Sequence, residues 1–442
     1  MRKMYVNVNN KKVAFCTLGC KVNQYESDSM IDILKENGCE IVGFSQMADI
    51  YIVNTCSVTN MAERKSRQML HRAKKKNPNA VIVAAGCYVQ AAEEALAADL
   101  GIDLLVGNNC KRDIARILDA YLGKQENNHA VIDINHTDEY EEMTLVKPNE
   151  RCRAYVKVQD GCNNFCSYCI IPYTRGRIRS RRREDVVREV EGLANHGVQE
   201  VVITGINLSS YEDEDGTTLL ALLQAVAQVE GIRRIRMGSL EPRVITDEFL
   251  QGIAAIPKVC PHFHLSLQSA CNETLKRMNR KYTIETYMER CEMIRRVYDR
   301  PAIATDIIVG FPGETDEEFE ITYANLEKLN LYEMHVFKYS KRSGTVAATM
   351  EHQVSDEKKE QRSNRLLALT AKQKAVYEQS FSGEIVSVLM EECENIGTKD
   401  APKYQMKGHT DRYILVKQPG SKALCEDSVN TFVDVVYRTE KS

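Results

Sequence analysis

Several features are missing from this sequence of 442 residues. It has no run of about 18 consecutive apolar residues, the length that a membrane helix needs. The segment Met1–Lys12 lacks the apolar core of a signal peptide. There is also no internal repeat and no low-complexity tract. These absences predict a cytoplasmic protein with no membrane partner.

An excess of one charge is missing as well. The chain has 59 Lys and Arg against 62 Asp and Glu, which leaves a formal net charge of -3. Such a balance argues against nucleic-acid binding through bulk charge, although it permits a local basic patch.

Cysteine, in contrast, is abundant, with 15 residues. Because the cytosol disfavours disulfides, clustered cysteines there predict metal binding or chemistry. Isolated cysteines such as Cys39, Cys291 and Cys393 are typical of small core residues.

The first 140 residues alternate between two patterns. Strand-like apolar runs occur at Val13–Leu18, Ile50–Asn54, Ala80–Ala85 and Leu104–Val106. Helical patterns lie between them at Ser27–Glu36, Met61–Lys75 and Lys111–Tyr121. This alternation predicts a parallel α/β sheet with helices on both faces. A polar stretch, Gly123–Glu150, is expected to link it to the next region.

The middle region repeats the alternation. Its predicted strands are Ala154–Gln159, Glu200–Thr204, Arg234–Met237, His262–Leu267, Ala302–Val309 and Glu333–Tyr339. Six β/α units in about 200 residues predict a complete or partial barrel, with the chemistry at the carboxyl ends of the strands.

The last part of the chain changes character. A helical pattern over Ser355–Gln379 is followed by short β-like runs at Glu384–Leu389, Tyr413–Val416 and Thr431–Tyr437, separated by Gly and Pro. These runs predict a small antiparallel barrel.

The strongest motif, Gly161–Cys169 (GCNNFCSYC), directly follows the first barrel strand. The thiols of Cys162, Cys166 and Cys169 have the spacing of a tight loop around one 4Fe-4S cluster. Three ligands leave the fourth iron open for the methionine part of S-adenosylmethionine (SAM), and the cofactor then performs the difficult chemistry. No side chain is therefore assigned as a catalytic residue. The alternative is a zinc site, or a cluster with a fourth cysteine elsewhere.

Three further cysteines are far apart in the first region. Cys20, Cys56 and Cys87 each follow a predicted strand within a residue or two. The carboxyl ends of parallel strands share one edge, so these thiols are expected to converge on a second cluster. Gly19 and Gly86 would allow close approach of a bulky ligand. The alternative is three unrelated core cysteines; Cys110 is expected to stay a free thiol or to add a fourth ligand.

Together the two sets of three cysteines resemble those of the methylthiotransferase family of radical SAM enzymes. The resemblance covers essentially the whole chain. The resemblance implies a flavodoxin-like domain at residues 1–140 with an auxiliary cluster on Cys20, Cys56 and Cys87. It implies a partial TIM-type radical SAM barrel at 145–375 with the SAM-cleaving cluster on Cys162, Cys166 and Cys169. It implies a TRAM-type RNA-binding β-barrel at 378–442, which includes Gly408–Tyr413.

The segment Leu18–Ser27 (LGCKVNQYES) is similar to one branch of this family, which acts on N6-threonylcarbamoyladenosine at position 37 of tRNA. The isopentenyladenosine branch typically has Gly-Cys-Gln-Met-Asn here, and the branch that acts on a ribosomal protein Gly-Cys-Pro-Lys-Asn. The resemblance implies radical methylthiolation at carbon 2 of the adenine, with sulfur from the auxiliary cluster and the methyl group from a second SAM. It also implies the tRNA anticodon stem-loop, a flavodoxin- or ferredoxin-type reductant and a sulfur source as partners.

Polar residues at the ends of the barrel strands are candidates for binding SAM or substrate. Gly205 and Asn207 suit the methionine part of SAM, Glu241 a ribose hydroxyl, and Gln268 the barrel interior. Asp306 interrupts an apolar strand and needs a partner, either an adenosine or an internal arginine. Tyr168 lies between two cluster cysteines and is predicted to pack near the adenine or to shield the cluster. Ordinary turns and a structural polar network are the alternatives.

Six arginines lie in residues 175–183 beside the cluster motif. Arg175, Arg177, Arg179 and Arg181 are predicted to contact tRNA phosphates at the mouth of the active site. The alternative is a solvated or internally paired set, because Glu184 and Asp185 follow directly. A non-enzymatic alternative for the whole chain is an RNA-binding or redox-sensing iron–sulfur protein.

Overall fold

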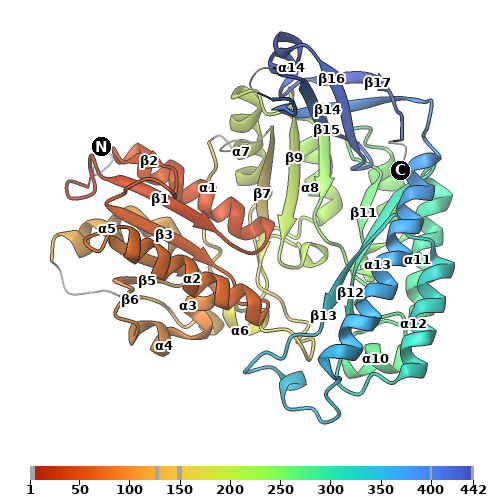
Figure 1. Ribbon diagram of the computed structural model, residues 1–442, viewed down its shortest axis with the longest axis horizontal. Helices are drawn as coiled ribbons and strands as arrows, with labels where there is room; N and C mark the ends of the chain where they lie inside the picture. Colours follow the sequence, from red (N-terminus) through yellow and green to blue (C-terminus); the bar gives the residue numbers. More distant parts are fainter. Residues whose placement is uncertain (1–4, 125–128, 147–151, 399–400, 440–442) are drawn as a thin grey trace.

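The computed structural model describes residues 5–124, 129–146, 152–398 and 401–439. Figure 1 shows three groups of strands in chain order: an N-terminal sheet, a curved middle sheet and a C-terminal sheet that packs on one end of the middle one. Within the described residues, no helix is both long and apolar enough to cross a lipid bilayer.

The N-terminal sheet is parallel, in the order β2-β1-β3-β4-β5-β6. Its strands are β1 (Lys12–Thr17), β2 (Glu40–Val42), β3 (Ile50–Thr55), β4 (Val81–Gly86), β5 (Leu104–Val106) and β6 (His129–Ala130). Its helices are α1 (Lys21–Glu36), α2 (Asn60–Lys76), α3 (Cys87–Ala91), α4 (Glu93–Ala97) and α5 (Ile114–Leu122). Separate apolar cores on the two faces show that helices cover both. The first five strands have the flavodoxin-like order, which confirms the predicted fold.

The stretch that was expected to be a polar linker packs against both neighbours. It supplies β6, and its buried Tyr140 donates a hydrogen bond from its hydroxyl to the carbonyl of Lys157 at 2.8 Å. Ile134, Met143 and Leu145 are also buried. Residues 125–128 and 147–150 of this stretch lie outside the described residues.

The middle region is an open parallel barrel. Its strands are β7 (Arg153–Asp160), β9 (Glu200–Gly205), β10 (Arg234–Met237), β11 (His262–His264), β12 (Ala302–Val309) and β13 (Glu333–Lys338), with β8 (Arg179–Ser180) antiparallel to β7. A bridge from Leu240 to Leu265 joins the β7-β9-β10 half to the β11-β12-β13 half. Among the described residues β13 does not pair with β7, so the barrel is partial. β11 is shorter than predicted because the chain pairs only singly beyond His264 and turns at Gln268, whose φ is 75°.

Helices surround this barrel. They are α6 (Ile171–Thr174), α7 (Arg183–Asn195), α8 (Leu219–Ala227), α9 (Asp247–Ala254), α10 (Asn272–Arg277), α11 (Ile284–Val297), α12 (Asp316–Leu329) and α13 (Asp356–Gln379). Short 3₁₀ turns lie at η1 (Lys111–Asp113), η2 (Ile134–His136), η3 (Leu208–Ser210), η4 (Pro242–Val244) and η5 (Val346–Ala348).

The C-terminal sheet is antiparallel, in the order β16-β15-β14-β17. Its elements are β14 (Ile385–Asn395), β15 (Tyr404–Thr410), β16 (Leu415–Gly420), α14 (Lys422–Ser428) and β17 (Phe432–Val436). A bulge between Met390 and Glu392 bends the long strand β14. The sheet lies against the amino ends of the barrel strands, where the Arg234 guanidinium donates to the carbonyls of Ser387 and His409 at 2.6 and 3.0 Å. The antiparallel architecture is as predicted, but β15 was missed.

Candidate active site

The loop that carries Cys162, Cys166 and Cys169 follows β7 at the carboxyl end of the barrel. Its backbone is fixed from two sides, since the Cys162 amide donates to Gly176 and the Ser167 amide to Met278, both at 3.1 Å. Gly161 has φ +72°, and a Cβ there would lie 1.8 Å from the Arg177 carbonyl oxygen. Only glycine fits at position 161, so the backbone at the start of the loop has one closely defined path.

The three thiols of this loop act on one another. Burial first, and then the neighbouring Cys166 and Cys162, raise the pKa of the Cys169 thiol to about 12. None of the three forms a disulfide. Arg280 donates from Nη1 to the Cys166 sulfur at 3.3 Å. Three adjacent unpaired thiols with a cation beside them fit the donor set of an iron–sulfur cluster.

The end of β9 lies against this loop. The Asn207 side-chain amide is 3.9 Å from the Cys162 sulfur, and its backbone amide donates to Gln159 Oε1 at 2.7 Å. A Cβ on Gly205 would lie 2.8 Å from that same oxygen. Gln159 also donates to the Gly161 carbonyl at 2.8 Å and so ties the strand end to the cluster loop. This geometry suits the predicted contact of Gly205 and Asn207 with the methionine part of SAM, which stays a prediction.

Glu241, at the end of the third strand, has three polar neighbours. It accepts a hydrogen bond from Asn164 of the cluster loop and is 3.0 Å from Arg243 and 3.8 Å from Arg280. The carboxylate is therefore held beside the cysteine loop, and its role toward a ribose stays a prediction.

The remaining candidates are Tyr168, Gln268 and Asp306. Tyr168 packs edge-on against Phe311, with ring centroids 6.4 Å apart. Gln268 is bound through its backbone to β12. Asp306 lies 3.2 Å from Nε2 of His264, so its partner within the described residues is a histidine and not the internal arginine considered from sequence. The donor atoms of His264, Asp306 and His335 all lie within 4.8 Å of one another.

Cys20, Cys56 and Cys87 meet at the carboxyl edge of the N-terminal sheet. Cys20 directly precedes α1, Cys56 follows β3, and Cys87 begins α3. Burial first, and then the nearby thiols of Cys87 and Cys20, raise the pKa of Cys56 to about 12. A Cβ on Gly19 would lie 3.0 Å from the Cys56 sulfur. Three thiols from separate strand ends thus share one environment, as the sequence predicts, and the donor set again fits a cluster. The charges that act on Cys110 come from Glu141 and its chain neighbours and not from this trio.

A buried network of charges joins the two cysteine sites. Glu26 of α1 pairs with Lys111 at 2.5 Å, Arg175 at 2.8 Å and Lys157 at 3.0 Å. Asp160, which precedes the cluster loop, pairs with Lys157 and Arg175 at 2.6 and 3.1 Å. Burial alone would raise the pKa of Glu26, but the three cations hold it well below its usual range. Figure 1 shows α1 between the N-terminal sheet and β7, where this network lies.

This network corrects the prediction for three arginines. Arg175 is completely buried, Arg179 donates to the Arg175 carbonyl, and Arg181 is bound by Glu142 and Glu189. Their guanidinium groups are therefore not free to bind phosphate, and the internally paired alternative holds for them. Arg177 is half-buried and stacks over Phe165 of the cluster loop at 4.7 Å, and its contact with tRNA stays a prediction.

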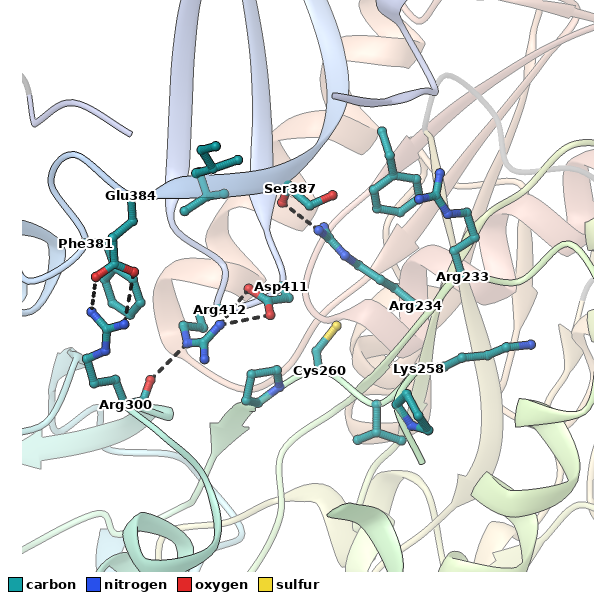
Figure 2. A pocket seen from close by; sticks show the side chains of 16 residues that line it. Arg233, Arg234, Lys258, Cys260, Arg300, Phe381, Glu384, Ser387, Asp411 and Arg412 are labelled. Atoms are coloured by element: carbon teal, nitrogen blue, oxygen red, sulfur yellow. Dashed lines mark hydrogen bonds and ion pairs between the residues drawn. The ribbon is translucent and has the colours of Figure 1, made fainter. Parts of the chain in front are cut away.

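A basic cavity of about 410 Å³ lies where the C-terminal sheet meets the amino ends of the barrel strands. Figure 2 shows that Arg300 faces Glu384 and that Arg412 faces Asp411, whereas Arg233 and Lys258 extend without an acidic partner among the residues drawn. Arg233 is exposed and stacks over Phe432 at 4.1 Å. Its residues come from six separate segments of the chain, so no local motif in the sequence marks this site.

Both the barrel and the N-terminal domain match known protein families. Residues 156–326 match the Radical SAM superfamily, and residues 12–107 match a family described as uncharacterized protein family UPF0004. A solved structure of the radical SAM methyltransferase TsrM from Kitasatospora setae has a TM-score of 0.55 at 14% identity. It covers 74% of this chain and 72% of that chain, and it shows likeness of fold alone.

Curated relatives match almost the full length. Threonylcarbamoyladenosine tRNA methylthiotransferase MtaB of Bacillus subtilis is 39% identical, over 96% of this chain and 93% of the relative. The tRNA-2-methylthio-N(6)-dimethylallyladenosine synthase of Thermoanaerobacter pseudethanolicus is 38% identical, over 90% and 85%.

Fold, cysteine loop and family match together define a radical SAM enzyme. Within that class, the chain belongs to the tRNA methylthiotransferases. Such an enzyme uses SAM and two 4Fe-4S clusters, in agreement with the two trios of thiols.

Several residues that support these sites carry no signal in the sequence. Arg280 contacts a cluster cysteine from a loop 114 residues further along the chain. Gln159 and Glu26 had no local signal, because Asn207 and Arg175 are brought to them only by the fold.

Proposed function

We propose that the protein attaches a methylthio group to carbon 2 of N6-threonylcarbamoyladenosine at position 37 of tRNA. The observation that carries this proposal is the presence of two trios of thiols, one at the carboxyl end of the barrel and one at the carboxyl edge of the N-terminal sheet, linked by the charge network of Glu26 and Arg175. The names of the first two relatives support the choice of threonylcarbamoyladenosine.

Six cysteines hold the clusters in this proposal, Cys162, Cys166 and Cys169 in the barrel and Cys20, Cys56 and Cys87 in the N-terminal domain. When bound, the clusters and SAM supply the radical and the sulfur chemistry. Arg280 donates a hydrogen bond to the Cys166 sulfur, and Gln159 fixes the loop relative to the end of β9. Asn207 and Glu241 orient SAM from the strand ends.

The tRNA anticodon stem-loop is the macromolecular substrate. In this proposal Arg177 at the cluster loop, and Arg233 and Lys258 at the basic cavity, contact the phosphates; Arg233 is exposed, and the other two are half-buried. A flavodoxin- or ferredoxin-type reductant and a sulfur donor are the further partners that the chemistry requires.

The test is a nucleoside profile of tRNA from cells that lack the protein. We expect loss of 2-methylthio-N6-threonylcarbamoyladenosine, accumulation of its precursor, and recovery by the intact gene but not by variants with Cys162→Ala or Cys20→Ala. If this nucleoside persists and 2-methylthio-isopentenyladenosine is lost instead, the substrate is the one named for the Thermoanaerobacter relative. If all tRNA nucleosides are unchanged, a ribosomal-protein substrate or a non-enzymatic role becomes the better account.

A further inference from the structure

Lys21 is the first residue of α1 and directly follows Cys20. Both side chains are exposed to solvent. The charges that act on the Lys21 ammonium nevertheless come from inside the barrel: Arg153 on β7, Arg236 on β10 and Asp306 on β12. Because α1 packs against β7 and β9, Lys21 extends from the N-terminal domain toward the barrel strands.

The other polar groups near Lys21 have partners of their own. Arg236 is 2.8 Å and Arg153 is 3.3 Å from Glu200, and Asp306 is 3.2 Å from His264. No carboxylate of the described residues lies within ion-pair distance of Lys21. The Lys21 ammonium is therefore available to an anionic ligand, which would form a charge-assisted hydrogen bond with it.

Imidazole groups lie in the same region. His262 stacks on Tyr413 with ring centroids 5.3 Å apart, and His264 stacks on His335 at 5.7 Å. The Nδ1 atoms of His262 and His264 are buried and have no hydrogen-bond partner. The Lys21 charge acts on His262, so the ammonium and the imidazoles belong to one site. Burial, together with Arg236 and Lys21, lowers the pKa of His262 well below its usual range, so this ring is neutral and can bond to an uncharged hydroxyl.

We infer that Lys21 binds the carboxylate of the threonylcarbamoyl group. The imidazoles of His262 and His264 form hydrogen bonds with the hydroxyl of the same group. This inference rests on the proposed function. It adds the residues that recognise the substituent on N6 of the adenosine. A threonyl group offers one carboxylate and one hydroxyl, which match one unpaired ammonium and two unpartnered ring nitrogens. An isopentenyl group offers neither, so it would leave these polar atoms unsatisfied. Lys21 is thus a specificity-determining residue for the reaction.

The test compares two substrates on each enzyme preparation. The first is an anticodon stem-loop that carries threonylcarbamoyladenosine, and the second is the same stem-loop with the threonyl carboxylate as its methyl ester. For the reconstituted wild-type enzyme we expect kcat/KM for methylthiolation to be roughly 10- to 100-fold lower with the ester. For Lys21→Met we expect a similar loss with the acid and little further loss with the ester. Lys21→Arg should keep most of the wild-type preference, because the positive charge remains.

The ratio of the two substrates is independent of how fully a preparation is loaded with clusters, so a partly loaded Lys21→Met enzyme still gives an answer. Lys75→Met, at an exposed lysine of α2, is the matched control and should keep the wild-type ratio. An acid-to-ester ratio in Lys21→Met equal to that of the wild type would overturn the inference while the proposed function stands. A wild-type enzyme that modifies isopentenyladenosine and neither of these stem-loops would instead refute the proposed function.

Discussion

The two cysteine sites are built in opposite ways. Cys162, Cys166 and Cys169 lie on one short loop whose path is fixed by Gly161 and by a few backbone hydrogen bonds. Cys20, Cys56 and Cys87 come from three strand ends and meet only when the parallel sheet has formed. The first site is therefore a property of a local sequence and the second a property of the fold. Variants that separate the two properties test this contrast.

The largest effects are expected from the cysteines themselves. Cys162→Ala should reduce 5′-deoxyadenosine formation from SAM by at least about 1000-fold, because cleavage depends on that cluster. Cys20→Ala should continue to cleave SAM but should form no methylthio product. Each variant should lower the iron content from about eight to about four per chain. Iron analysis, 5′-deoxyadenosine assays and tRNA nucleoside analysis check these outcomes, and methylthiolation by Cys20→Ala would contradict the assignment.

The second-largest effect is expected from the buried charge network around Glu26, which links the two cysteine sites. Glu26→Gln leaves Lys111, Lys157 and Arg175 buried with less compensating charge, which should lower the free energy of unfolding by about 3–5 kcal/mol. Urea titration of cluster-free protein near pH 7 measures it. Glu94→Gln, at an exposed residue of α4, is the control and should change it by less than about 0.5 kcal/mol.

The difference in the free energy of unfolding between the wild type and Glu26→Gln depends on pH, and the sign of this dependence follows from the pKa of Glu26. The pKa of Glu26 is lowered in the folded protein, so its stabilising contribution is complete above its unfolded pKa of about 4.3 and is lost as the pH falls toward the folded value. The difference in stability between the wild type and Glu26→Gln should therefore shrink only below about pH 4. A difference that is already lost near pH 6 would show that Glu26 is not ionised as described.

Glycine variants are expected to disturb one cysteine site at a time. They should reduce activity less than the cysteine variants do. Gly161→Ala places a Cβ 1.8 Å from a carbonyl oxygen, and Gly86→Ala places one 2.6 Å from Asn54 Oδ1, both at positive φ. We expect Gly161→Ala to reduce SAM cleavage and Gly86→Ala to reduce only methylthiolation, each roughly 10- to 100-fold. Gly192→Ala, in α7 with open space around it, should leave both activities intact. Equal loss of both activities in Gly86→Ala would show that the sites are not independent.

The smallest effect is expected at the basic cavity. Arg233→Ala should weaken tRNA binding a few-fold and reduce the slope of log affinity against log salt by about 1, as expected for one lost phosphate contact. Filter binding at several salt concentrations measures this. Arg116→Ala, where Arg116 pairs with Asp113 on the N-terminal domain, is the control.

The same contrast explains what the sequence could predict. The spacing of Cys162–Cys169 revealed the first site directly, and the shared position of Cys20, Cys56 and Cys87 after strands revealed the second once a parallel sheet was assumed. The arginines were misjudged because a run of basic residues resembles a surface, whereas the carboxylate that pairs with Arg175 lies 149 residues earlier. β15 was missed because Tyr404–Thr410 is mostly polar and contains Gly408, which packs closely on β14.

The charge network at Glu26 also limits how this protein can be divided or recombined. Lys111 and Glu26 belong to the N-terminal half, whereas Lys157, Asp160 and Arg175 belong to the barrel. A barrel expressed alone would contain two of these cations and one carboxylate, with the cationic surplus at a newly exposed surface. A chimaera that exchanges either half with a relative would therefore have to transfer all five residues as a set, so these halves are expected to evolve, and to be engineered, as one unit.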